Sequence, residues 1–187
     1  MLKGHGVEVT GIDPIRALLD AAQARDPEGT YLEAAAERLP FDDDAFDLVV
    51  SYLSLIDIPS VQEGISEMAR VLKPGGALLI ANLTSFNTAC ADAGWVKNSD
   101  GQHLYYPVDN YLQERPVWVE FRGIRVINHH RPMSIYMSAL LGAGLRLTYF
   151  DEPTPSADAP TSEASEYIRA PWFLVMEWVK PAQGERS

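Results

Sequence analysis

The sequence predicts an α/β fold, an open and mostly parallel β-sheet with helices on both faces. Short β-rich segments alternate with segments of helical hydrophobic period. Residues 46–53 are almost continuously apolar, as in a strand covered on both faces. The run Lys73-Pro74-Gly75-Gly76 separates an amphipathic helix from the apolar strand at 77–81. With 187 residues and 47% hydrophobic content, the chain has material for one core, so we expect a single domain over residues 1–187.

Up to residue 76, the sequence predicts three strands and two helices. A strand at 7–12 leads to Asp13-Pro14, where Asp can cap a helix that Pro begins. A short strand follows near 31–32, and the central strand at 46–53 comes next. A capping box over residues 60–63 predicts the start of the second helix. The predicted buried stripes are Ile15, Leu18, Leu19 and Ala22 in the first helix and Val61, Ile65, Met68 and Leu72 in the second.

The second half is less regular. Residues 82–131 are rich in aromatic side chains and predict an inserted lid with some antiparallel strand. A helix over 133–141 and a strand over 145–150 follow. Residues 153–165 are rich in Pro, Ser, Thr and Ala and predict a mobile loop, and 172–179 form the last strand.

Charge and cysteine content exclude several classes of partner. The net charge of −11 opposes binding to nucleic acid or to an anionic membrane, and no apolar run reaches membrane-spanning length. Cys90 is the single cysteine, so an intrachain disulfide is excluded and a cytoplasmic location is expected. No spacing of ligands predicts a metal site. The only protein partner that we consider is a second copy, in a homodimer.

The segment from Arg70 to Gly76, Arg-Val-Leu-Lys-Pro-Gly-Gly, resembles the same turn in class I S-adenosylmethionine-dependent methyltransferases. The resemblance covers nearly the whole chain and is most specific over residues 7–83. It implies a Rossmann-like sheet that ends in a C-terminal antiparallel hairpin. It also implies S-adenosylmethionine as cofactor, S-adenosylhomocysteine as product and a small molecule as methyl acceptor.

Two segments are candidates for cofactor binding. Asp13 ends a parallel strand, where a carboxylate can accept both hydrogen bonds of a ribose diol; the alternative is that Asp13 only caps the next helix. Residues 35–41 resemble the family's Asp-Ala-Glu-x-Leu-Pro-Phe segment, which holds the adenine. Ala35 stands where the family has Asp, so the backbone amide of Ala36 remains while the carboxylate is absent. That difference removes about 1–2 kcal/mol of hydrogen bonding.

Further candidates come from strand ends and from a histidine pair. Ser51 and Tyr52 end the central strand, where the family places the methionine part of the cofactor and the acceptor. His130 and Arg131 are candidates to line the substrate, because His can take a proton and Arg can bind an anion. The alternative is that they pair with nearby carboxylates and pin the lid. Asp57 is expected to be a local cap, and no catalytic residue is assigned.

The family's first strand and its Gly-x-Gly-x-Gly loop have no counterpart in the sequence, and Gly4-His5-Gly6 cannot replace that loop. The missing strand belongs at the centre of the sheet. The flanking strands could pair directly in a contracted sheet, another chain could donate a strand, or the start codon could lie upstream. We expect a truncated product or a misassigned start.

The sequence therefore predicts methyl transfer to an O, N or C atom of a small molecule, conditional on the missing loop. A non-catalytic binding or interaction module on the same scaffold is the alternative. A nicotinamide dinucleotide enzyme is disfavoured, because the Leu39-Pro40-Phe41 turn, the Lys-Pro-Gly-Gly turn and the terminal hairpin occur together in methyltransferases.

Overall fold

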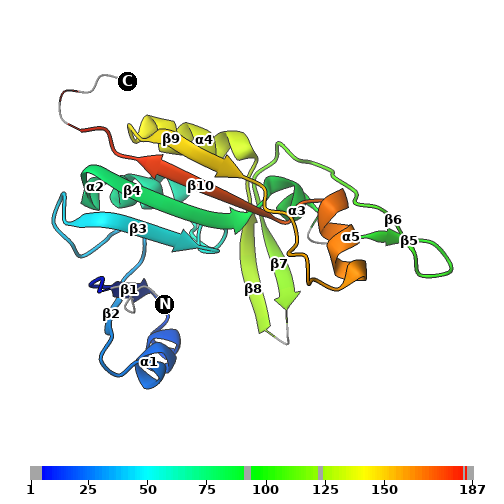
Figure 1. Cartoon of the computed structure of the whole chain (residues 1–187), viewed down its shortest axis with the longest axis horizontal. Coiled ribbons are helices and arrows are strands. Elements are labelled where there is room, and N and C mark those ends of the chain that lie inside the picture. The colour runs from blue at the N-terminus through cyan, green and yellow to red at the C-terminus, as the bar shows by residue number, and fades with distance from the viewer. Residues whose placement is uncertain (1–5, 91–93, 122–123, 183, 185–187) are drawn as a thin grey trace.

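The computed structural model describes residues 6–90, 94–121, 124–182 and 184 (Figure 1). Gly4 and His5 lie outside this part. The helices and strands are β1 (Thr10–Asp13), α1 (Arg16–Arg25), β2 (Thr30–Glu33), β3 (Phe46–Tyr52), α2 (Val61–Val71), β4 (Leu72–Leu83), α3 (Ser85–Ala89), β5 (Val96–Lys97), β6 (His103–Tyr105), β7 (Arg115–Phe121), β8 (Ile124–His130), α4 (Met133–Gly142), β9 (Arg146–Asp151), α5 (Thr161–Arg169) and β10 (Phe173–Val179).

The largest sheet has four strands in the order β3-β4-β10-β9. Strands β3 and β4 are parallel, and β10 is antiparallel to both β4 and β9, which confirms the predicted C-terminal hairpin. Helices α2 and α4 cover one face of this sheet and form the core with it. The predicted α2 stripe is buried throughout, whereas the apolar side chain of Leu141, in α4, is exposed. Ser60 is the N-cap of α2, but its side chain makes no capping hydrogen bond, so the predicted capping box is wrong.

Strands β1 and β2 form a separate parallel pair with α1 beside them (Figure 1). Among the described residues, no ladder joins β1 to β3, so the structure does not show the contracted sheet. Within the described sheets, β1 is hydrogen-bonded only to β2, and β3 is hydrogen-bonded only to β4. Of the predicted α1 stripe, Leu19 is buried while Ile15 and Leu18 are exposed.

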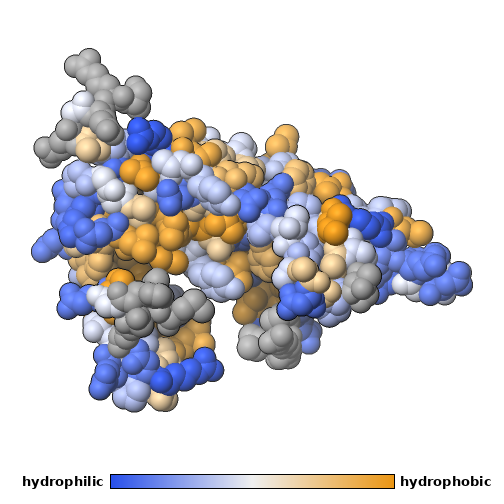
Figure 2. Space-filling model, viewed as in Figure 1, coloured by the Kyte–Doolittle hydropathy of each residue, from blue (hydrophilic) through white to orange (hydrophobic). Residues whose placement is uncertain are grey.

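The second face of the four-stranded sheet carries apolar side chains that α2 and α4 do not cover. Because neighbours alternate along a strand, Val50 and Tyr52 lie on the face opposite to Val49 and Ser51. Val50 is 49% exposed and Tyr52 is 73% exposed. Figure 2 shows apolar residues gathered over this part of the molecule. A surface of this kind favours association with another polypeptide.

The region predicted as a lid contains α3 and two antiparallel hairpins, β5–β6 and β7–β8. The β7–β8 hairpin projects away from the main sheet (Figure 1). The prediction of a loop over 153–165 is wrong in its last part, because α5 begins at Thr161. Helix α5 contacts the smaller hairpin through Arg169, which donates to the carbonyls of His103 and Leu104 and lies over the ring of Trp95. Within the described residues, no helix combines the length and the apolarity that a membrane crossing requires.

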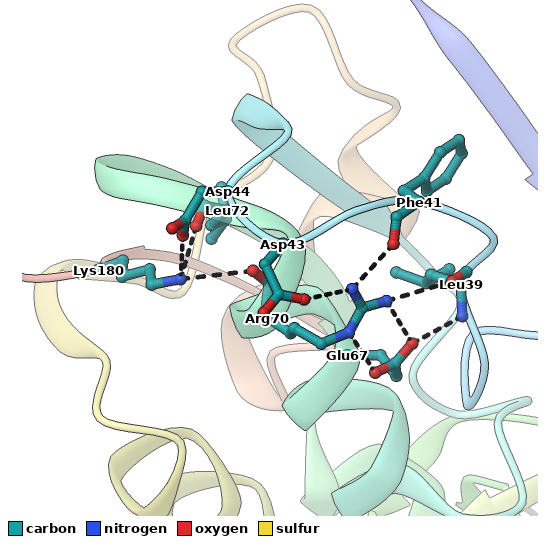
Figure 3. A network of polar contacts seen from close by, with 8 residues as sticks. All are labelled: Leu39, Phe41, Asp43, Asp44, Glu67, Arg70, Leu72 and Lys180. Atoms are coloured by element: carbon teal, nitrogen blue, oxygen red, sulfur yellow. Dashed lines mark hydrogen bonds and ion pairs between the residues drawn. The ribbon is translucent and has the colours of Figure 1, made fainter.

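Arg70 joins the two sequence motifs that carry the family resemblance (Figure 3). Its guanidinium donates twice to Glu67, at 2.7 and 2.8 Å, and to the carbonyl oxygens of Phe41, at 2.8 Å, and Leu39, at 3.2 Å. It also pairs with Asp43 at 2.8 Å, so this guanidinium holds the turn at 39–43 against α2.

The acidic turn at 42–44 is held by ion pairs. Asp44 pairs with Lys180 at 2.7 Å, and Lys180 also donates to the carbonyl oxygen of Leu72 (Figure 3). Lys73 lies beyond the end of α2 and pairs with Asp47 at 2.8 Å. Gly75 has a φ of +82°, a conformation that favours glycine. Residues 73–76, predicted to separate the helix from the strand, instead form the first part of β4, and contacts with Asp47 and Lys180 hold this part in place.

Candidate functional site

Asp13 is the last residue of β1, and its side chain is half-buried. One carboxylate oxygen, Oδ1, accepts the backbone N–H of Ile15 at 2.7 Å. The helix begins two residues later than predicted, with Ile15 as its N-cap. Asp13 therefore orders the turn into α1 without being the N-cap. Oδ2 has no hydrogen bond to the described residues, so this oxygen remains available as an acceptor.

Ala35 and Ala36 lie in the turn that follows β2. This turn is tied to β1, because the N–H of Ala34 donates to the carbonyl oxygen of Asp13 at 3.3 Å. It is tied to the main sheet unit as well: Glu37 accepts the N–H of Ser60 at 3.3 Å. The amide of Ala36 has no acceptor among the described residues. The turn that is tied to Asp13 therefore contains an amide with no acceptor among the described residues, while Ala35 presents an exposed methyl group.

Ser51 and Tyr52 end β3 with opposite environments. Ser51 is buried and hydrogen-bonded to Ser54, with 2.7 Å between the two hydroxyl oxygens. Tyr52 is largely exposed, and the next residue, Leu53, has a φ of +52°. This left-handed residue turns the chain sharply into residues 53–59, which we call the β3–α2 loop. The loop begins at the carboxyl end of β3, where open α/β sheets bind ligands.

Asp57, in the β3–α2 loop, is the residue that sequence reasoning undervalued. Desolvation and the negative charge of Asp13 raise the pKa of its carboxyl to about 6, although the side chain reaches solvent. The two carboxyls are thus electrostatically coupled across the ends of β1 and β3. The described residues show no capping hydrogen bond from this side chain; the Asp57 backbone N–H donates to the Ser54 carbonyl. The only sequence signal was its place five residues after a strand end.

His130 is fully buried and bonded through both ring nitrogens. Nδ1 lies 2.8 Å from the hydroxyl of Thr88, and Nε2 lies 2.9 Å from the carbonyl oxygen of Tyr111. Since a carbonyl only accepts, Nε2 carries the proton and Nδ1 accepts from Thr88. Burial lowers the pKa of His130, and the positive charge of Arg115 lowers it further. The imidazole therefore joins α3 to the chain at 111 in a neutral form.

Arg131 is 3% exposed, and its guanidinium faces the β3–α2 loop. It donates to the carbonyl oxygens of Leu55, Ile58 and Pro59 at 3.1, 2.7 and 2.7 Å. One carboxylate, that of Glu114, lies 3.6 Å from Nε. The alternative prediction, pairing with nearby carboxylates, is wrong for His130, which bonds a hydroxyl and a carbonyl within residues 82–131. For Arg131 it applies only to the contact with Glu114, because its other partners are backbone carbonyls. The role of His130 and Arg131 as substrate-lining residues stays a prediction.

Aromatic residues surround the same end of the sheet. Phe86, in α3 just after β4, is half exposed and stacks on Tyr111 with 5.4 Å between ring centroids. Tyr111 in turn meets the ring of His130 edge-on at 5.9 Å. Together with Tyr52, these rings give the carboxyl end of the sheet an apolar, aromatic character.

Within the described residues, no group of three His, Cys, Asp or Glu side chains is arranged to hold a metal ion. Cys90 is buried and free, and its thiol donates to the carbonyl oxygen of Pro107 at 2.6 Å. Burial raises the pKa of this thiol to about 11, so it is not an activated nucleophile at neutral pH.

Three comparisons with known proteins bear on this site. Residues 1–80 match the family described as "Methyltransferase domain". The chain is 27% identical over 173 residues to malonyl-[acyl-carrier protein] O-methyltransferase of Salmonella typhimurium, with 90% of this chain and 67% of that protein covered. It is 31% identical over 134 residues to ubiquinone/menaquinone biosynthesis C-methyltransferase of Campylobacter jejuni, with 63% and 57% covered. The chain thus spans between about half and two thirds of the length of these curated relatives.

Among solved structures, a crystal structure of an S-adenosylmethionine-dependent methyltransferase from Listeria monocytogenes superposes with a TM-score of 0.82. It is 27% identical, and the match covers 92% of this chain and 79% of the other. The predicted Rossmann-like fold and its antiparallel C-terminal strands agree with this neighbour. The chain is thus similar to S-adenosylmethionine-dependent methyltransferases, in its first 80 residues by the family match and over most of its length by fold.

Proposed function

We propose that the protein transfers the methyl group of S-adenosylmethionine to a small, largely apolar acceptor at the carboxyl end of its sheet. One observation carries the proposal. The parallel pairs β1–β2 and β3–β4 belong to separate sheets, but Asp13 at the carboxyl end of β1 acts electrostatically on Asp57, in the loop that follows β3. Ligands of α/β folds bind at the carboxyl ends of parallel strands, and Asp13 lies there with a carboxylate oxygen that is free of hydrogen bonds to the described residues.

The residues present fit part of the cofactor that the family uses. Asp13 supports the ribose assignment, because Oδ2 is free while Oδ1 is fixed by Ile15. The unpaired amide of Ala36 supports the adenine assignment, and Ala35 supplies no carboxylate to the adenine amino group. Ser51 would lie near the methionine part through its position at the end of β3. The cofactor supplies an electrophilic methyl group, and the chain's own task is to bind, orient and exclude water.

An apolar acceptor is supported by the exposed ring of Tyr52 and by the stacked pair Phe86 and Tyr111. A general base is optional in such a transfer, because holding the acceptor atom in line supplies most of the rate. Asp57 is the group whose raised pKa suits proton acceptance near neutral pH. The two curated relatives suggest a quinone-type ring or a carrier-bound acyl carboxylate as the first acceptors to assay.

The free, buried thiol of Cys90 is compatible with the reducing cytoplasm, and we propose that location. A homodimer is proposed through the uncovered apolar sheet face at Val50.

Calorimetric titration with S-adenosylhomocysteine tests the proposal directly. We expect saturable binding that Asp13→Asn weakens about tenfold, because a charged hydrogen-bond acceptor is replaced by a neutral one. Asp20→Asn is the matched control: Asp20 is exposed on α1, and its one ion-pair partner among the described residues is Arg16. Absence of binding up to millimolar ligand would refute the proposal. That result would favour the non-catalytic binding module, which the missing carboxylate at Ala35 also favours.

A further inference from the structure

The β3–α2 loop turns several carbonyl oxygens inward toward one cation. The backbone N–H groups of Asp57 and Ile58 both donate to the Ser54 carbonyl, at 2.9 and 3.2 Å, so this stretch is tightly wound. The carbonyls of Leu55, Ile58 and Pro59 then receive the guanidinium of Arg131. Buried carbonyls need donors, and here one side chain supplies three of them.

The cation comes from a distant part of the chain. Arg131 lies between β8 and α4, and the next residue, Pro132, is the N-cap of α4. The neighbouring His129 adds a fourth tie, since its backbone N–H donates to the Ile56 carbonyl at 2.6 Å. The loop is thus fastened at four consecutive or near-consecutive carbonyls to the end of the β7–β8 hairpin. The four bonds leave the side chain of Asp57 pointing outward to solvent.

The β3–α2 loop lies at the carboxyl end of the sheet, where we propose that the cofactor binds. It continues directly from β3 and carries Asp57, whose carboxyl is coupled to that of Asp13 at the end of β1. Between β1 and β3 the described structure has no hydrogen-bonded ladder to fix the distance between the two strand ends. The geometry of this edge therefore depends on how firmly the β3–α2 loop is held.

We propose that Arg131 is a positioning residue: without touching the ligand, it fixes the β3–α2 loop against the β7–β8 hairpin and so holds the cofactor-binding edge in its binding geometry. This inference rests on the proposed function for its consequence and on the three carbonyl contacts for its mechanism. This positioning role replaces the predicted role of Arg131 in binding a substrate anion. The N–H groups of the guanidinium that face the loop already donate to backbone carbonyl oxygens. The hairpin and the cofactor edge are thereby mechanically linked.

The test compares Arg131→Lys and Arg131→Met with Arg125→Met. Arg125 lies on the same hairpin, with its guanidinium 4.4 Å from the Trp118 ring and no bond to the loop, so it controls for loss of an arginine in β8. Amide hydrogen exchange is followed in residues 53–59 and, as an internal reference, in α2. Affinity for S-adenosylhomocysteine is measured by calorimetry on the same samples.

We expect exchange in residues 53–59 to rise about tenfold in Arg131→Met, with affinity falling about tenfold. Arg131→Lys should recover part of both, since an ammonium can still donate to one or two of the carbonyls. NMR titration of Asp57 should show its pKa moving back toward the ordinary value as the loop opens to water. Arg125→Met should leave all three readouts unchanged.

Unchanged loop exchange in Arg131→Met would overturn the inference, and so would faster exchange with unaltered affinity. If the unmodified protein binds no S-adenosylhomocysteine, the proposed function fails, and loop exchange together with the Asp57 titration alone decides whether Arg131 fixes the loop. Glu114→Gln serves if the Arg131 variants do not fold. It removes the carboxylate 3.6 Å from Nε, and a rise in loop exchange, smaller than for Arg131→Met, is then required.

Discussion

Replacement of His130 by Phe should make the protein less stable at neutral pH and should abolish one part of its acid sensitivity. Phe keeps the ring volume and the contact with Tyr111 but removes both ring nitrogens. The carbonyl of Tyr111 then loses its donor, whereas Thr88 can donate to the Ser85 carbonyl, 3.3 Å away. One buried group is left unpaired, so we expect a loss of about 1–3 kcal/mol in the free energy of unfolding.

The pH dependence follows from the lowered pKa of His130. In the unfolded chain the group titrates near its ordinary value of 6.5, and in the folded protein it titrates below that value. The unfolded state therefore binds more protons as the pH falls through 6.5, so this contribution is complete above that pH and is lost on acidification. The loss is at most about 1.4 kcal/mol per pH unit for one group.

Urea unfolding at about pH 7.5 and about pH 5.5 measures both effects. The change in unfolding free energy between the two pH values should be larger for the unmodified protein than for His130→Phe, because His130 titrates only in the former. Part of the change should remain in the variant, because His129, whose pKa is also lowered, titrates in both. Thr88→Val should cost about 1 kcal/mol, and the double variant should cost less than the sum. The assignment of a neutral imidazole with two hydrogen bonds would be refuted by either of two results. One is an equal change in unfolding free energy between the two pH values for both proteins, and the other is strict additivity of the His130→Phe and Thr88→Val effects.

Three further predictions concern the ligand edge and the exposed sheet face. Ala35→Asp should tighten binding of S-adenosylhomocysteine about tenfold by restoring an acceptor for the adenine amino group, and unchanged affinity in calorimetry would contradict the adenine placement. Asp57→Asn should raise the free energy of unfolding at pH 7 by about 1 kcal/mol, because a carboxylate whose folded pKa is raised to about 6 opposes folding above that pH. This figure is discounted for the exposure of the side chain, and the gain should vanish near pH 4 in urea titrations. Val50→Lys should reduce self-association in sedimentation, since it places a charge on the uncovered apolar face, and a monomeric unmodified protein at every concentration would contradict that surface assignment.

The parts of the fold that depend on local pattern could be predicted from the sequence. The stripe from Val61 to Met68 has a helical period and packs on the sheet, so burial follows from spacing alone. The exposed face of α1 could not be read in this way. Ile15 and Leu18 have the same period, but whether such a stripe is buried depends on which element packs against it.

The same distinction between local pattern and contacts in space applies to the residues of the candidate site. Asp13, Ser51 and Tyr52 could be named as candidates because strand ends are visible in a sequence and parallel strands share an edge, whereas Ala36 was named from the resemblance of residues 35–41 to a family segment. The partners of His130 and Arg131 could not, since carbonyls such as that of Ile58 carry no residue signature and lie more than 70 positions away. The pKa of Asp57 was equally hidden, because it results from burial and from the approach of Asp13 in space.

The position of β10 has a consequence for how the chain reaches its structure. This strand is the last in sequence, yet it lies between β4 and β9, and Lys180 just after it contacts Asp44 and Leu72. During synthesis, β4 and β9 have no shared partner until the residues up to 180 have left the ribosome. The four-stranded sheet must therefore close late and over long sequence separations, which predicts slow folding and a period when its apolar strands depend on chaperones.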